Sequence, residues 1–277
     1  MSETNAAPNQ GLTNDTLIPY SKNGLWGYCN TERKVIIPCK YHLVSAFSEG
    51  LGSVCFDERF GFINATGKMV IPRKFDFASS FFEGLAAVSI KGKFGYIDKA
   101  GSVIIPADFN FASDFEGGVA LIEKKGKMGY VNKAGKIVVP CKYDAISTFK
   151  NGVAIAEIGG KEVFIDLTGK ETETPPDPDF RDGLCPEYSE EFDAYGFINE
   201  ARELVVPHTY EMVNDFSEGL AGVCDNGLWG FINTKGEMVI EPKYADVAMD
   251  FREGLALVFI DDEELGYIDA QGNEYWD

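Results

Sequence analysis

Residues 85–106 decide the fold: Leu85-Ala-Ala-Val-Ser-Ile90, Lys91-Gly92-Lys93, Phe94-Gly-Tyr-Ile-Asp98, Lys99-Ala-Gly101 and Ser102-Val-Ile-Ile-Pro106. Three runs rich in β-branched and aromatic residues alternate with two short segments that end in, or contain, glycine. Such runs are typical of strands, and the glycine segments are typical of tight turns. The segment therefore predicts a three-stranded antiparallel meander.

The same pattern recurs along the chain with a period of about 34 residues. A glycine followed by an aromatic residue marks the second strand of each unit. The marker positions are Gly27, Gly61, Gly95, Gly129, Val163, Gly196, Gly230 and Gly266, with valine replacing glycine in the fifth. Arrays of this kind bury the apolar face of each unit against its neighbours. We expect an all-β domain of eight units over residues 17–277, preceded by a disordered segment at 1–16.

Eight units can form an open array or close into a ring. A period of 34 residues is short for a four-stranded propeller blade, and the chain begins with a first strand and ends with a third. Both ends are also atypical, with Ile18 and Arg33 in the first unit and Asn273-Glu-Tyr-Trp-Asp277 in the last. These features favour an open, solenoid-like array with capped ends. A closed β-propeller-like ring is the alternative.

Individual positions of the unit have structural interpretations. The aromatic residue after each marker is predicted to lie in the core. The Asn or Asp three residues after the marker is predicted to cap its own turn, because five of the eight are Asn and calcium would prefer carboxylates. The proline that follows the third run is predicted to end strand pairing, since it has no N–H to donate. Turn solvation is favoured over an edge ladder for the acidic residues before a repeat glycine: Glu49, Glu83, Asp182, Glu218 and Glu253.

The repeated segments also carry a family resemblance. Leu25-Trp26-Gly27-Tyr28, Lys93-Phe94-Gly95-Tyr96-Ile97-Asp98 and Leu228-Trp229-Gly230-Phe231-Ile232-Asn233 are each followed by a glycine turn, a V-I-I-P-like run and an F-x-E-G-L-like segment. This combination resembles the WG-repeat family of tandem β-repeats. The sequence departs from the pattern because tryptophan precedes only two of the eight markers and the fifth unit is eroded. The resemblance implies an interaction module of a kind common in bacterial proteins, without established chemistry.

Charge is unevenly distributed along the chain. The 25 basic and 44 acidic residues give a net charge of −19. Residues 1–150 contain 18 basic and 14 acidic residues, whereas residues 151–277 contain 7 and 30. An acidic surface repels nucleic acid and anionic lipid, so we expect neither as a partner. The candidate partner-binding acidic surface comprises Glu187, Glu190, Glu191, Asp261, Asp262, Glu263 and Glu264.

Residues that could support catalysis are scarce. The chain has two histidines, His42 and His208, and both occupy variable linker positions of the repeat. Its six cysteines form no C-x-x-C pair, and no nucleotide-binding or hydrolase motif occurs. We therefore expect no enzyme activity, no catalytic residue, no cofactor and no metal. No apolar run approaches the ~18 residues of a membrane span. The first ten residues lack a secretory signal pattern, which favours a cytoplasmic protein, with a mature secreted chain as the alternative.

Two functional hypotheses follow from these features. The first is a non-enzymatic scaffold for protein–protein interaction, in which the acidic half selects a basic partner. The second is a carbohydrate or cell-envelope binding module that stacks sugars on repeated aromatic rings, with Trp26, Trp229 and Trp276 exposed. Exposed aromatic ladders favour sugar binding, and buried rings favour the scaffold.

The fifth unit departs from the pattern at several positions together. Val163 replaces the marker glycine, Glu162 replaces the aromatic residue before it, and Thr174-Pro-Pro-Asp-Pro-Asp179 stands where the third run should be. Prolines at this density cannot sustain a central strand. We therefore predict an irregular unit over 163–190, with a bend or local opening between residues 170 and 190.

Overall fold

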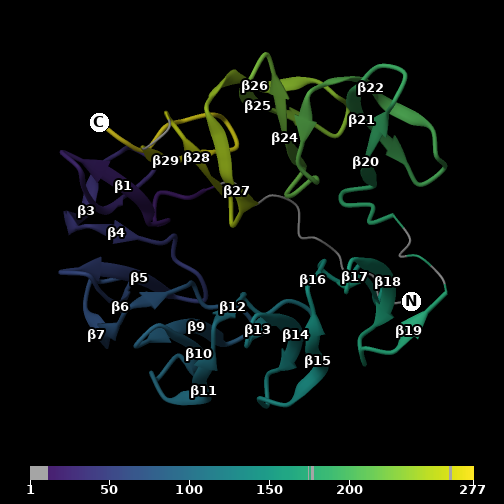
Figure 1. The fold of residues 1–277 in the computed structure, drawn as a ribbon. Helices are drawn as coiled ribbons and strands as arrows, with labels where there is room; N and C mark the ends of the chain where they lie inside the picture. Colours follow the sequence, from purple (N-terminus) through teal and green to yellow (C-terminus); the bar gives the residue numbers. More distant parts are fainter. Residues whose placement is uncertain (1–11, 174, 176–177, 262–263) are drawn as a thin grey trace. The chain divides into compact units, whose positions relative to one another are not determined.

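The computed structural model describes residues 12–173, 175, 178–261 and 264–277, and these residues form strands and turns without helices (Figure 1). The predicted all-β class is confirmed. In this part of the chain no helix has the length and apolar character that crossing a membrane requires. The described residues divide into two compact units: unit 1 lies within Met1–Asn23, Tyr28–Ile36 and Pro178–Asp277, and unit 2 within Gly24–Gly27 and Ile37–Asp177.

The described strands pair into eight small antiparallel sheets. Five sheets have four strands each: β4(Leu43–Val44)-β5(Leu51–Phe56)-β6(Arg59–Asn64)-β7(Met69–Phe75), β8(Phe77–Ala78)-β9(Leu85–Ile90)-β10(Lys93–Asp98)-β11(Val103–Phe109), β12(Phe111–Ala112)-β13(Val119–Lys124)-β14(Lys127–Asn132)-β15(Ile137–Tyr143), β16(Ala145–Ile146)-β17(Val153–Ile158)-β18(Lys161–Asp166)-β19(Glu171–Thr172), and β23(Met212–Val213)-β24(Leu220–Asp225)-β25(Leu228–Asn233)-β26(Met238–Tyr244). Three have three strands: β1(Ile18–Lys22)-β2(Leu25–Cys29)-β3(Val35–Tyr41), β20(Leu184–Ser189)-β21(Ala194–Asn199)-β22(Leu204–Tyr210), and β27(Asp246–Arg252)-β28(Leu255–Phe259)-β29(Leu265–Asp269).

The three-stranded meander predicted from the sequence is wrong for the five four-stranded sheets. Their additional strand is only two residues long and follows the proline predicted to end strand pairing. In the sheet of β8–β11, Phe77 pairs with Ser89 and Ala78 pairs with Val88. This short strand covers the edge of β9 that β10 leaves free, so it satisfies backbone groups that would otherwise lack partners.

The two turns of the sheet of β8–β11 form as the sequence predicts. The hairpin between β9 and β10 turns at Lys91 and Gly92, whose φ values of 53° and 71° are the left-handed values of a tight hairpin turn. At the next turn, Oδ1 of Asp98 accepts hydrogen bonds from the N–H groups of Ala100 and Ser102, at 3.0 and 2.8 Å. The side-chain-capped turn is thereby confirmed, and the same pattern recurs at Asn64, Asn132 and Asp166.

The repeat proline lies inside the third strand rather than after it. Pairing between β10 and β11 joins Tyr96 to Ile105 and Phe94 to Phe109, so a step of two residues on β10 faces a step of four on β11. The extra residues form a bulge that contains Pro106. A bulge leaves its residues outside the regular ladder, so the missing N–H of proline costs no hydrogen bond there. The prediction that this proline ends pairing is wrong.

The bulge explains the marker glycine. A Cβ on Gly95 would lie 2.5 Å from the backbone oxygen of Ile105 and 2.7 Å from the backbone nitrogen of Ala107, too close for any side chain. The fifth repeat tolerates Val163 because its third strand, β19, is a two-residue segment that pairs only through Phe164–Thr172 and Ile165–Glu171 among the described residues. No bulge crosses Val163 in that described pairing.

The hydrophobic cores lie between neighbouring sheets within each unit. The ring of Tyr96 on β10 packs 4.7 Å, between centroids, from the ring of Phe115, which follows β12 in the next sheet. Equivalent pairs are Phe62–Phe81, Tyr130–Phe149, Phe197–Phe216 and Phe231–Phe251. The predicted burial of the aromatic residue after the marker is confirmed in seven of the eight repeats, whereas Phe164 of the eroded fifth repeat is only half-buried. Stability within a unit therefore depends on contacts between consecutive repeats.

The acidic residue before the repeat glycine links one repeat to the next. Oε1 of Glu49 accepts the N–H of Gly84 at 3.0 Å, and its other oxygen lies 2.8 Å from Nζ of Lys99. The same carboxylate-to-N–H contact joins Glu83 to Gly118, Asp182 to Gly219 and Glu218 to Gly254. Simple turn solvation is therefore the wrong interpretation for these four residues, since each caps the turn that follows it in the array.

The first and last strands of the chain meet within unit 1. The C-terminal residues bond β29 on one edge, where Tyr275 donates its N–H to Tyr267, and β1 on the other, where Ser21 bridges Trp276 in parallel (Figure 1). Nζ of Lys22 lies 2.7 Å from the carboxylate of Asp277. The prediction of two separate capped ends, and with it the open array, is contradicted by this junction.

Two sequence expectations concern the irregular segments. One boundary between the compact units falls between residues 177 and 178, inside the predicted interruption, where residues 174, 176 and 177 lie outside the described residues. The bend itself stays a prediction. Of the segment expected to be disordered, residues 1–11 are also outside the description, whereas Oδ1 of Asn14 accepts a 2.6 Å hydrogen bond from Oγ1 of Thr31.

Candidate functional site

The acidic residues singled out from the sequence lie on equivalent hairpins of two sheets in unit 1. Glu187 is on β20, and Glu190 and Glu191 are exposed in the turn that leads to β21. Asp261 and Glu264 are exposed in the turn between β28 and β29, where Asp261 accepts the N–H of Glu264 at 2.8 Å. Asp262 and Glu263 lie outside the described residues. The sheet of β23–β26 comes between these hairpins in the chain, so the two acidic groups form no single cluster in the contacts described.

The division into units sharpens the charge asymmetry. The sequence of unit 2 contains 17 basic and 17 acidic residues, so its net charge is zero. The sequence of unit 1 contains 8 basic and 27 acidic residues, a net charge of −19. The entire net charge of the protein therefore belongs to one compact unit.

Unit 2 carries a second feature, a repeated row of three residues at the start of its hairpins. In each four-stranded sheet of unit 2, one residue of the first long strand pairs with two others. On one side it pairs with the first residue of the two-residue strand, and on the other side with the second residue of the next long strand. For the sheet of β8–β11 this central residue is Ser89, which faces Phe77 on one side and Phe94 on the other. Neighbouring sheets have the equivalent rows Leu43-Cys55-Phe60, Phe111-Glu123-Met128 and Ala145-Glu157-Glu162.

Four phenylalanines of these rows form a continuous series of ring contacts. The ring centroids are 5.7 Å apart for Phe60–Phe77, 5.8 Å for Phe77–Phe94 and 6.3 Å for Phe94–Phe111, and the ring planes are inclined by 50° to 57°. Phe77 and Phe111 remain 43% and 42% exposed, although large rings usually pack away from water. We call Phe60, Phe77, Phe94 and Phe111 the phenylalanine row.

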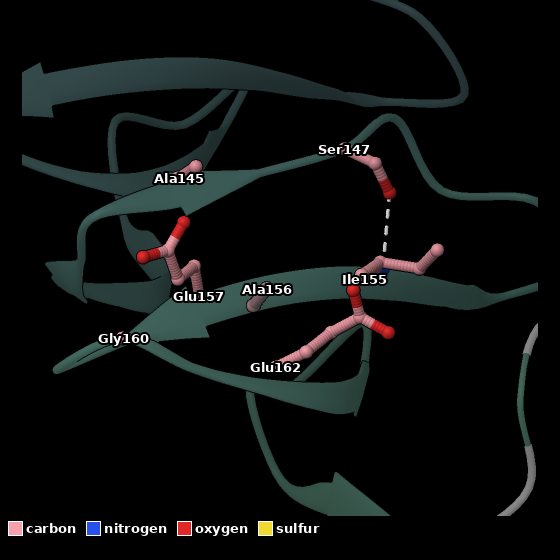
Figure 2. A pocket seen from close by; sticks show the side chains of 7 residues that line it. All are labelled: Ala145, Ser147, Ile155, Ala156, Glu157, Gly160 and Glu162. Atoms are coloured by element: carbon pink, nitrogen blue, oxygen red, sulfur yellow. Dashed lines mark hydrogen bonds between the residues drawn. The ribbon is translucent and has the colours of Figure 1, made fainter.

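A pocket lies further along the same series of positions, after Met128, which is the equivalent of Phe60 and Phe94 in the sheet of β12–β15. It has a volume of about 450 Å³ and is lined by Ala145, Ser147, Ile155, Ala156, Glu157, Gly160 and Glu162 (Figure 2). Ala145 occupies the position of Phe77 and Phe111, and Glu162 occupies that of Phe60 and Phe94. On one side of the pocket, Oγ of Ser147 accepts the N–H of Ile155 at 2.9 Å (Figure 2). No phenylalanine ring fills the positions of Ala145 and Glu162, so a pocket remains beyond the end of the phenylalanine row.

Two carboxylates line this pocket on paired strands. Glu157 of β17 and Glu162 of β18 are directly opposite in the sheet register, and both side chains are exposed. Like charges in directly opposite positions repel each other. In the part of the chain that the structure describes, neither carboxylate has a hydrogen-bonding or ionic partner. The pocket is therefore suited to a group that brings positive charge and apolar surface together.

The two histidines contact neighbouring side chains, and three of the cysteines lie in environments that disfavour the reactive thiolate. His42 stacks on Phe56 with ring centroids 5.5 Å apart, and Nε2 of His208 lies 3.0 Å from the carboxylate of Glu187. Burial raises the pKa of the Cys55, Cys141 and Cys224 thiols, which disfavours the nucleophilic thiolate. No group of three or more His, Cys, Asp or Glu side chains suited to a metal ion occurs among the described residues.

The three-stranded meander predicted from the sequence does not include the short strands that contribute to the pocket and the phenylalanine row. A signal was present, since Leu43, Phe77, Phe111 and Ala145 recur at intervals of 34 residues. The tryptophans proposed as exposed sugar platforms are not exposed. Trp229 is 6% exposed and Trp26 and Trp276 are half-buried, so that expectation is wrong.

Several solved structures are similar to this chain at low identity. The crystal structure described as the eukaryotic initiation factor is 10% identical, covers 99% of this chain and 88% of its own, and has a TM-score of 0.49. An extracellular domain of a hybrid two-component system from B. thetaiotaomicron is 10% identical over 96% of this chain and 44% of its own, with a TM-score of 0.48. The CNH domain of AfRom2 is 11% identical over 85% and 93%, with a TM-score of 0.45. Similarities this distant carry no information about function.

The sequence comparisons identify the repeat itself. No match was found among curated proteins. The family described as WG containing repeat matches six segments: 26–59, 60–94, 94–127, 128–161, 195–229 and 229–263. Residues 162–194, which contain the eroded fifth unit, are left unmatched between the fourth and fifth of these segments. Because the matches extend over well more than half of the sequence, the chain belongs to the WG-repeat family, as its repeated glycine–aromatic markers indicated.

Proposed function

We propose that this protein is a non-enzymatic scaffold for protein–protein interaction, located in the cytoplasm, whose acidic unit 1 selects a basic protein partner. The observation that carries the proposal is the partition of charge: unit 1 has a net charge of −19 and unit 2 has none. Solubility alone needs a net charge of only about 2 to 8 on a small domain. The excess, confined to one unit, favours a role in recognition.

The positions of the acidic groups support this role. Glu190, Glu191, Asp261 and Glu264 are exposed in hairpin turns, so they can contact a partner without loss of internal hydrogen bonds in strands. Charges in this arrangement accelerate the encounter with an oppositely charged protein and select against acidic ones. Their effect is screened beyond about 8 Å at physiological ionic strength, so it depends on salt.

The absence of enzyme activity is part of the same proposal. It is supported by the environments of Cys55, Cys141 and Cys224, in which burial raises the thiol pKa values, and by the two histidines, His42 and His208, belonging to different compact units. General acid–base or nucleophilic catalysis needs such groups to be within reach of each other and of a substrate.

The test begins with chemical cross-linking in a lysate of the source organism, followed by mass spectrometry and binding measurements with the purified partner. A variant that combines E190Q, E191Q, D261N and E264Q should bind at least about tenfold more weakly. The matched control is D57N with E58Q, which neutralises the corresponding β5–β6 hairpin of unit 2 and should bind normally. A partner that is itself acidic, or whose affinity does not change between low and high salt, would overturn the proposal.

A further inference from the structure

Along unit 2, the side chains of the three-residue rows change from aromatic to acidic. The second and third rows present the exposed rings of Phe77 and Phe111, and the next row presents Ala145 with the carboxylates of Glu157 and Glu162. Exposed apolar surface that is continuous across several sheets is uncommon on proteins that make no contact there. Here it ends in a pocket with unpartnered negative charge.

We propose that the phenylalanine row and the adjoining pocket form a docking surface for an extended peptide segment of a partner protein, in which apolar side chains precede an arginine or lysine. The apolar side chains contact Phe77 and Phe111. The basic side chain enters the pocket at Ala145 and meets Glu157 and Glu162. This surface consists of residues of unit 2 and shares none with the acidic hairpins of unit 1, so it goes beyond the function proposed above.

The spacing of the rings favours an extended peptide. Successive centroids of the row are 5.7 to 6.3 Å apart. In an extended chain, side chains on one face recur every two residues, at about 6.6 Å. Phe77 and Phe111, the exposed rings, are two such steps apart through Phe94, so an extended segment can contact both with side chains about four residues apart on one face. Sugars prefer flat, accessible ring faces, and the 50° to 57° inclinations leave the row without a common flat face.

The chemistry of the pocket favours a basic side chain at the end of that segment. Its volume of about 450 Å³ lies within the range of about 300–1,000 Å³ typical of ligand pockets. Ile155, which is 37% exposed, offers apolar surface to the aliphatic stem of arginine or lysine, whose charged head can remain near water and the carboxylates. A cation between Glu157 and Glu162 also relieves the repulsion between them. Arginine is the better fit because its planar head can bond two carboxylates at once.

The first experiment uses a random twelve-residue phage-displayed peptide library, selected against the full chain. We expect enrichment of sequences with apolar residues at alternating positions followed by arginine or lysine. The enriched sequence is then synthesised and its affinity is measured by fluorescence anisotropy at two salt concentrations. Selection of acidic sequences, or no enrichment over a blank surface, overturns the proposal.

Variants of the chain locate the site. E157Q combined with E162Q should weaken binding about tenfold, because two exposed charge contacts are lost. A145F, which restores the ring found in the preceding rows, should fill the pocket and abolish the preference for arginine over citrulline in the peptide. F111A should weaken binding of both peptides equally. Thermal unfolding of each variant verifies that it is folded, and if A145F is not, the E157Q/E162Q pair decides.

The outcomes for this site and for the acidic unit are distinguishable. The E190Q/E191Q variant of unit 1 and the D57N/E58Q variant should bind the selected peptide with unchanged affinity. If E190Q/E191Q abolishes peptide binding and E157Q/E162Q does not, the peptide binds unit 1 and the docking surface on unit 2 is refuted. If the peptide behaves as expected but the unit 1 variants retain the cellular partner, the function proposed for unit 1 fails alone.

Discussion

Replacement of Gly95 by alanine tests the packing that defines the repeat. The added Cβ would lie 2.5 Å from the backbone oxygen of Ile105 and 2.7 Å from the backbone nitrogen of Ala107. Both atoms belong to the backbone of β11, so no side-chain rotation can relieve the contact. The bulge around Pro106 must move away from β10 as a whole.

The expected cost follows from that movement. Overpacking of a filled interior costs about 1–3 kcal/mol. Displacement of β11 also weakens the pairing of Tyr96 with Ile105, and each backbone hydrogen bond contributes about 1 kcal/mol. We expect Gly95→Ala to lower the free energy of unfolding by about 3 kcal/mol. For a protein of this size, that corresponds to a decrease in Tm of about 6–12 °C.

The assay is urea and thermal unfolding followed by far-ultraviolet circular dichroism, with Gly222→Ala as the matched control. A Cβ on Gly222 would meet side chains only, Nδ2 of Asn214 at 3.2 Å and the ring of Trp229 at 3.4 Å. The control should therefore stay within about 1 kcal/mol of the native protein. If Gly95→Ala is as stable as Gly222→Ala, the bulge does not explain the marker glycine.

Three further predictions concern other features of the repeat. Phe62→Ala and Phe231→Ala should each lower the free energy of unfolding by about 3–5 kcal/mol, since both rings are buried, and unchanged thermal unfolding of both would refute their core role. Glu49→Gln should destabilise the protein at neutral pH, because the hydrogen bond from Lys99, followed by that from Gly84, holds the pKa of Glu49 below its ordinary 4.5. A carboxylate whose pKa is lowered in the folded state stabilises the fold at pH values above its ordinary pKa, and this stabilisation is lost as pH falls through the folded-state pKa. The difference in Tm between the native protein and the variant should therefore vanish in acid, and a difference independent of pH would contradict this assignment. Limited proteolysis should cut first within residues 171–190, and hydrogen exchange there should be faster than in the second to fourth repeats. Protection of this segment equal to that of Phe94–Pro106 would exclude a local opening.

The features that the sequence predicted are those governed by local interactions. The period of about 34 residues places the strands, because turn residues and side-chain alternation act over a few residues. The side-chain cap at Asp98 is local for the same reason, since it bonds N–H groups only two and four residues ahead. Burial of Phe62 and its equivalents follows from their place on an apolar face. For the candidate site, the sequence identified the acidic residues that the structure places on exposed hairpins of unit 1.

The remaining features depend on which strands become neighbours, and only the tertiary structure decided them. The fourth strand exists because β9 has a free edge that residues 77–78 can cover, and Pro106 is tolerated inside β11 because a bulge forms opposite Gly95. The junction of Ser21 with Trp276 joins segments 255 residues apart, for which the repeat contains no signal. The phenylalanine row and the pocket at Ala145 likewise arise between sheets, where side chains from consecutive repeats meet. Local sequence determines what each repeat can form, whereas contacts between repeats determine which surfaces remain exposed, because a residue's burial depends on the neighbour packed against it.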